Sequence, residues 1–265
     1  ATERQDFLPV FGTLNFAPNE TQKTITILLT DGAVVEDDET FNISLFNTSG
    51  DAALGSPSIA TIQIIDDDTD PSAANPIDNP EFFVRQHYQD FLNREPDAAG
   101  LEFWSNEIAS CGTDSDCLNI KRQNVSAAFF FSIEFQETGF LVYRLNRAAF
   151  ARFPGFTESL RDTQQLGRGV VVAVGDWQAR LEANKAQFVE HFIQRPEFLS
   201  AFPPDLAPAE FVNRLDENSG FSLLPDEKEL LIQQLEEDLI TRVDVLRTIA
   251  DDGDFRAREF NRAFV

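Results

Sequence analysis

The chain has 265 residues, enough for one large domain or two ordinary ones, and an apolar fraction of 42%, enough to bury a core. A formal net charge of −24 at pH 7 disfavours nucleic acid and anionic membranes as partners and favours cations. No apolar run approaches the ~20 residues that a membrane-spanning helix needs.

Residues 1–69 show apolar residues at every second position in four short segments: GTLNF, TITILL, TFNISLF and ATIQII. Turn-forming sequences such as APNE, TDG and NTSGD separate these segments. Alternation with a period of two indicates strands with one buried face. We therefore expect residues 1–69 to form an antiparallel, all-β sandwich.

Residues 70–80, DPSAANPIDNP, predict an extended linker. Beyond it the apolar period becomes 3.6, which predicts an all-α helical domain over residues 81–265. This part contains a partial internal repeat, because FFVRQHYQDFLNREP at residue 82 recurs loosely as FLVYRLNRAAFARFP at residue 140. A further echo begins at DFRAREFNRAFV near the end of the sequence.

Three adjacent carboxylates, Asp66, Asp67 and Asp68, end the last predicted strand. Calcium takes six to eight oxygen ligands, mostly carboxylates, and a cation among these side chains would offset their repulsion. The simpler alternative is a solvated acidic end that leads into the linker.

Residues 1–70 resemble the C-terminal part of a Calx-beta domain through three phrases: DFLPVFGTLNFAPNETQKTITI, DGAVVEDDETFNISLFNTSGDAALG and ATIQIIDDD. The resemblance implies a Greek-key sandwich that is incomplete at its N-terminus, with a sheet edge that a strand from elsewhere can pair with. It also implies calcium at one end of the sandwich. The implied ligands are Asp6, Asp31, Glu36, Asp66, Asp67 and Asp68.

The segment FFVRQHYQDFLNREPDAAGLEFW resembles the bacterial domain-of-unknown-function family 4214, which occurs in extracellular and surface-layer-like proteins. The resemblance covers about residues 80–150. The local physics is clear without the family, because Pro96 ends one helix and Asp97 is placed to cap the next. The family implies a location at the bacterial cell surface but no reaction.

No catalytic motif stands out. His87 and His191 are both expected on helix faces, no zinc-ligand spacing occurs, and GRGVVVAVG lacks the context of a nucleotide-binding loop. We therefore expect a non-enzymatic structural or adhesive module, part of a larger chain or assembly, that binds itself or a surface matrix. The alternative is a secreted carbohydrate-active enzyme with an acidic cleft in the helical domain.

Cys111 and Cys117 flank the short polar sequence GTDSD. An even number of cysteines in a secreted protein predicts a disulfide, and two unpaired thiols are the alternative. Asp114 and Asp116 within this segment fit a polar turn better than a cation site. Together these patterns predict an extracellular or cell-surface location in a bacterium.

Overall fold

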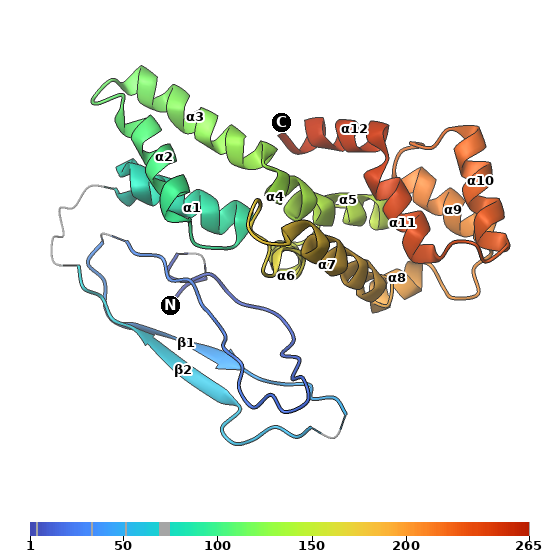
Figure 1. The fold of residues 1–265 in the computed structure, drawn as a ribbon, viewed down its shortest axis with the longest axis horizontal. Coiled ribbons are helices and arrows are strands. Elements are labelled where there is room, and N and C mark those ends of the chain that lie inside the picture. Colours follow the sequence, from blue (N-terminus) through green and yellow to red (C-terminus); the bar gives the residue numbers. More distant parts are fainter. Residues whose placement is uncertain (4, 33, 51, 69–74, 265) are drawn as a thin grey trace. The chain divides into compact units, whose positions relative to one another are not determined.

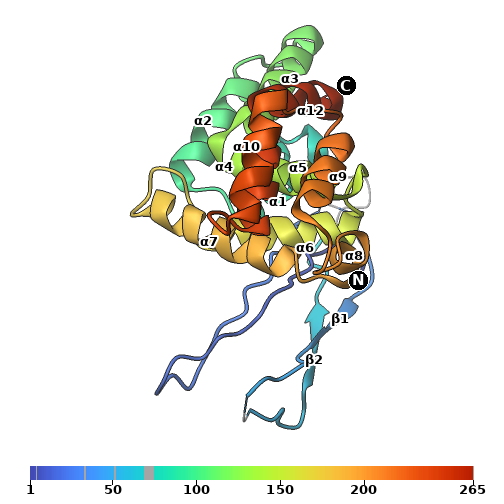
Figure 2. The ribbon, with the colours of Figure 1, turned by 90° about the vertical axis from the view of Figure 1, so that its right-hand side faces the viewer.

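The structure is a computed structural model, and it describes residues 1–3, 5–32, 34–50, 52–68 and 75–264. Most of the predicted linker, residues 70–74, lies outside the described residues. The structure confirms a β part followed by a helical part (Figures 1 and 2). The chain divides into two compact units. The first contains residues 1–10, 14–90 and 94–126, and the second contains residues 11–13, 91–93 and 127–265.

The β part of the first unit is built around two antiparallel strands, β1 (Glu39–Ser44) and β2 (Ile59–Ile64). Their register places Phe41 opposite Ile62. The Phe41 ring also stacks on Phe7, with ring centroids 4.0 Å apart. The strands thus use the alternation that the sequence predicted, with Phe41 on the covered face of β1.

Two other predicted strands, at GTLNF and TITILL, do not form a regular ladder within the described residues. The second of them is held by backbone hydrogen bonds from Leu8 N–H to Leu28 O (2.8 Å) and from Thr30 N–H to Asp6 O (2.9 Å). An extended segment becomes a strand only when a neighbour takes up its backbone groups. Alternating apolar residues indicate which face of an extended segment is apolar, but they do not indicate whether a neighbouring strand is present to pair with it.

The remainder of the first unit is helical. Asp97 caps the second helix as predicted, because its Oδ1 accepts the Gly100 N–H at 2.8 Å. The elements are η1 (Pro76–Asp78), α1 (Pro80–Leu92), α2 (Ala98–Ala109) and α3 (Ser115–Phe131), the last of which continues into the second unit.

The second unit is all helical, and its buried core is centred on α5, which packs against α4, α6, α9 and α11. Its helices are α4 (Ile133–Glu137), α5 (Gly139–Phe150), α6 (Phe156–Gly167), α7 (Trp177–Phe192), α8 (Pro196–Ala201), α9 (Pro208–Asn218), α10 (Pro225–Glu236), α11 (Arg242–Asp251) and α12 (Gly253–Phe264). None of the helices in the described part of the chain has the length and apolar character needed to cross a membrane.

The helices repeat in groups of four: α1–α4 (repeat 1), α5–α8 (repeat 2) and α9–α12 (repeat 3). The first helix of each group buries a valine completely, and these residues are Val84, Val142 and Val212. Each of these helices is followed by one non-glycine residue in the left-handed conformation: Asn93 (φ 53°), Ala151 (φ 53°) and Phe221 (φ 57°). The predicted offset of 58 residues therefore relates repeats 1 and 2, and a third copy begins at α9. The residues DFRAREFNRAF of this segment lie in α12, which holds the fourth-helix position of repeat 3.

Candidate calcium site and the surrounding functional elements

Three carboxylates of the β part converge. Asp6, Glu36 and Glu39 each offer an oxygen atom, and these oxygens all lie within 4.8 Å of one another. Asp6 directly precedes the buried Phe7, Glu36 lies in the loop before β1, and Glu39 is the first residue of β1. An oxygen-only group of this kind suits calcium better than zinc or copper.

Glu39 is the member of this group that the sequence interpretation missed. Its signal was available, because residues 39, 41 and 43 alternate on one face of β1. Phe41 on that face stacks on Phe7, the neighbour of Asp6. The stacked rings therefore bring the Glu39 and Asp6 carboxylates to the same place.

The electrostatics of the triad show mutual repulsion. The pKa of Glu39 is raised, first by its hydrogen bond with Asp6, then by burial and by the charge of Asp6. The Ala1 ammonium, 3.5 Å from Glu39 Oε2, offsets part of this repulsion, and a shared proton or a bound cation would offset the rest. A divalent ion would relieve the same repulsion without protonation.

The terminal Asp run lies beside the same loop. Asp66 Oδ2 accepts the backbone N–H of Glu36 at 2.9 Å. Burial and the charges of its acidic neighbours Asp66, Asp67 and Asp31 raise the pKa of Asp68. The predicted ligands thus fall into two sets: Asp6 and Glu36 join the triad with Glu39, whereas Asp31, Asp66, Asp67 and Asp68 form a second acidic group.

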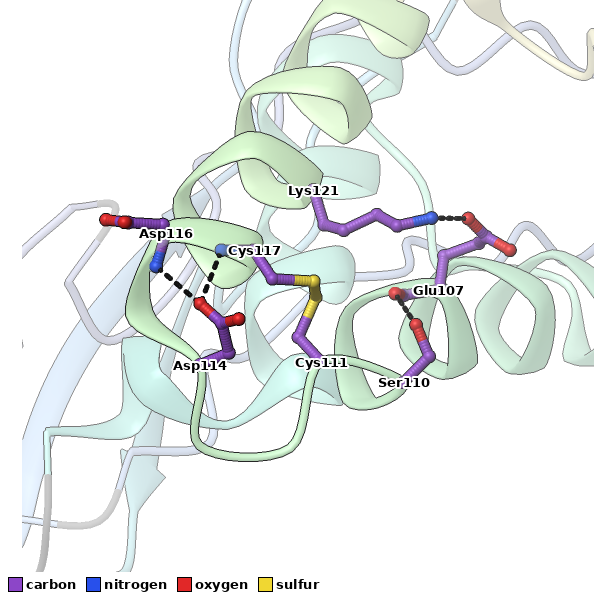
Figure 3. The surroundings of a disulfide bond; sticks show 7 residues. All are labelled: Glu107, Ser110, Cys111, Asp114, Asp116, Cys117 and Lys121. Carbon is purple, nitrogen blue, oxygen red and sulfur yellow. Dashed lines mark hydrogen bonds and ion pairs between the residues drawn. A yellow bond between two sulfur atoms is a disulfide. The ribbon is translucent and has the colours of Figure 1, made fainter.

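The structure contains the Cys111–Cys117 disulfide, with the two Cα atoms 5.5 Å apart (Figure 3). It closes the turn between α2 and α3. Asp114 Oδ1 accepts the backbone N–H groups of Asp116 and Cys117, each at 3.1 Å. Asp114 is therefore the N-terminal cap of α3, as the polar-turn interpretation expected.

Both histidines lie on helices. His87 Nδ1 is 2.8 Å from Phe83 O, and its Nε2 is 2.7 Å from Ser126 Oγ. Burial lowers the pKa of His87. His191 lies in the last turn of α7 with an exposed side chain. The contacts of His87 link α1 to α3, which is a structural role.

A groove of about 610 Å³ lies between the end of α5, α8 and α9 in the second unit. Its apolar lining includes the partly buried Phe150 and Ala201, and its rim carries Glu197 and Glu217. Glu197 accepts hydrogen bonds from Arg152 at 3.0 and 2.7 Å. Glu197 is thereby held in an ion pair with Arg152 at the edge of the groove.

Comparison with known proteins agrees with this geometry. Residues 1–68 match the family model of the Calx-beta domain, and residues 72–138 match that of a domain of unknown function, DUF4214. The chain joins a Calx-beta sequence to a DUF4214 sequence. Both predicted resemblances are thereby confirmed in the expected order.

The Calx-beta part is 41% identical over 68 residues to the sodium/calcium exchanger Calx of Drosophila melanogaster, covering 26% of this chain and 7% of the relative. It is also 38% identical over 85 residues to sodium/calcium exchanger 1 of Mus musculus, covering 26% of this chain and 9% of the relative. The chain thus spans less than a tenth of the length of these relatives. No solved structure matches the chain. The DUF4214 match coincides with repeat 1, so repeats 2 and 3 are additional groups of the same design.

Proposed function

We propose that this protein is a non-enzymatic structural or adhesive module of an extracellular or cell-surface bacterial assembly, and that calcium stabilises its Calx-beta part. The observation that carries the proposal is the convergence of Asp6, Glu36 and Glu39 within 4.8 Å. The similarity to two sodium/calcium exchangers supports the choice of calcium. The disulfide at the α2–α3 turn supports an oxidising compartment.

The triad is the first part of the proposed site. Glu39 brings a carboxyl group whose pKa is raised chiefly by Asp6, and calcium would offset the repulsion between these two groups. Asp66 is the link to the second acidic group, because its hydrogen bond with the Glu36 backbone joins the strand end to the loop. Side-chain oxygens of Asp31, Asp67 and Asp68 would then complete the coordination, together with water.

The test is thermal unfolding of the full chain in calcium, in magnesium and in chelator. Calcium should raise the melting temperature, because an ion that binds only the folded state at 100 times its Kd adds about 2.7 kcal/mol. Glu39→Gln should remove most of this gain. Asp37→Asn is the matched control, since Asp37 is an exposed acid of the same loop outside the triad.

Calcium titration by calorimetry provides an independent readout. Identical melting in all three conditions would refute the calcium site. A calcium effect that Asp37→Asn and Glu39→Gln reduce equally would show that the overall negative charge binds calcium, and that the triad does not.

A further inference from the structure

Repeats 2 and 3 each place an arginine on their first helix, and the two residues are related by the same offset of 70 as Val142 and Val212. Arg144 on α5 donates to Gln136 O near the end of α4 (3.3 Å). Arg214 on α9 donates to Ala201 O at the end of α8 (2.9 Å). The two arginines thus mark equivalent grooves, each between a short fourth helix and the first helix that follows it.

The first groove is filled by the junction of α11 and α12. Arg144 Nε donates to Ala250 O at 2.7 Å, and its Nη2 donates to Asp251 Oδ1 at 2.9 Å. On α12, the Phe260 ring packs against Phe140, with ring centroids 5.7 Å apart. As a result, the Arg144 side chain has no exposed surface.

The second groove is open. Its arginine, Arg214, contacts α8 and its own helix, where Nε donates to Glu210 at 2.8 Å, and 44% of the side chain is exposed. The partly buried Phe150 and Ala201 contribute apolar surface to the same groove. Glu217 on its rim forms no ion pair with any described residue. The groove therefore offers apolar, cationic and anionic surface at the position where its counterpart is covered by a helix junction.

The groove at Arg144 indicates what kind of segment would fit the open groove at Arg214. The filled groove at Arg144 holds the junction between the third and fourth helices of a repeat. The same junction in repeat 1, between α3 and α4, exposes two large apolar side chains: Phe131 (56%) and Ile133 (55%). In repeat 2 this junction instead carries Arg195, which forms two hydrogen bonds of 2.7 Å with the buried Asp162.

The α3–α4 junction cannot fill the open groove of its own molecule. The junction precedes the N-terminus of α5 (Figure 1), whereas the groove begins at the C-terminal residues of that helix, Ala149 and Phe150. Twelve helical residues separate these ends by about 18 Å. The two surfaces are thus displayed at different places on one chain.

We propose that the groove between α8 and α9 binds the α3–α4 junction of a second copy of this chain, so that copies associate head to tail. Ile133 packs on Phe150 and Ala201, and Phe131 lies against the Arg214 guanidinium, where a cation–π contact can form. Such a contact joins two different surfaces, so it forms open chains of molecules. The inference names a partner for the assembly role proposed above, and it does not depend on calcium.

The test is the molar mass of the full chain in solution, measured by light scattering over a concentration series. Chelator is present throughout, so that the result is separate from the calcium proposal. About 0.5 M salt is added, because the net charge of −24 repels like chains and salt screens that repulsion. The expected result for the native sequence is an average mass that rises with concentration beyond that of two chains.

Two variants each block one surface. Ile133→Asp places a charge on the α3–α4 junction, and Ser200→Trp fills the groove. Each variant alone should associate at least about tenfold more weakly. The matched controls are Ile120→Asp, at an apolar residue of similar exposure (58%) elsewhere on α3, and Ser200→Ala, and both should associate like the native chain.

The deciding measurement is an equimolar mixture of Ile133→Asp and Ser200→Trp. The first retains an intact groove and the second an intact junction, so the mixture should form a two-chain complex and nothing larger. A native chain that remains monomeric, a mixture that remains monomeric, or an Ile120→Asp variant as weak as Ile133→Asp would each overturn the proposal.

Discussion

Arg144 and Arg214 occupy equivalent positions in repeats 2 and 3, but only Arg144 is buried. Replacing each in turn therefore measures how much burial of this side chain adds to the free energy of unfolding. Arg144→Ala leaves the buried carbonyl of Ala250 without its donor, which costs about 1–3 kcal/mol. It also removes a fully buried side-chain stem, worth about 2 kcal/mol. Asp251 is 42% exposed and regains water, so its lost ion pair adds less than about 1 kcal/mol.

The sum predicts a loss of about 3–6 kcal/mol for Arg144→Ala. Arg214→Ala should cost less than about 1 kcal/mol, because its side chain is 44% exposed and its ion pair with Glu210 is a surface pair. Arg144→Met should fall between these values, since it restores the apolar stem.

The assay is urea unfolding followed by tryptophan fluorescence. A Trp104→Phe background leaves Trp177 on α7 as the reporter of the second compact unit. All variants are compared at an equal slope of unfolding free energy against urea concentration, so that a difference in the midpoint urea concentration reports a difference in stability. Losses for Arg144→Ala and Arg214→Ala that agree within about 1 kcal/mol would refute the reasoning, because burial would then not control the value of these contacts.

Two further predictions concern repeat 1. His87 and Ser126 occupy positions at which repeats 2 and 3 bury aliphatic side chains. Burial lowers the pKa of His87, so the folded protein binds a proton at this residue less readily than the unfolded chain does. Stability should therefore fall as the pH drops below about 6.5, and His87→Leu combined with Ser126→Val should flatten this dependence in melts from pH 7.5 to 5. A double variant with the native pH profile would assign the effect to other groups. Gly100→Ala should destabilise the first compact unit by about 1–3 kcal/mol, because a Cβ there would overlap the Tyr88 hydroxyl. The control Gly253→Ala meets no atom within 4 Å and should be neutral or slightly stabilising in the same melts.

Local signals in the sequence predicted local structure well. Asp97 was identified as a helix cap because its preference for that position depends on the neighbouring backbone alone. The relation between repeats 1 and 2 was visible because Val84 and Pro96 recur as Val142 and Pro154. The third copy was missed, since its turn places Leu224 where the others have proline. The backbone of the turn between α9 and α10 follows the same path as in the other repeats, because the packing of these two helices determines it.

The candidate site was predicted in part. Asp6 and Glu36 came from the Calx-beta resemblance, which fixes positions along the chain. Glu39 required knowledge that the Phe7 and Phe41 rings stack, which is a tertiary contact between distant segments. The open groove could not be predicted at all, because its three sides come from α5, α8 and α9 and no residue type marks it.

The left-handed turn residue bears on how the three repeats can diverge. The same backbone conformation is held by Asn93, Ala151 and Phe221, and a non-glycine residue there costs about 1–2 kcal/mol. Phe221 is 69% exposed, so its ring takes little part in the core. Repeat 3 therefore carries a backbone cost at this position, while the side chain there is nearly unconstrained. Evolution can change the chemistry of that side chain, and hence what the surface of one repeat recognises, without altering the helical hairpin beneath it.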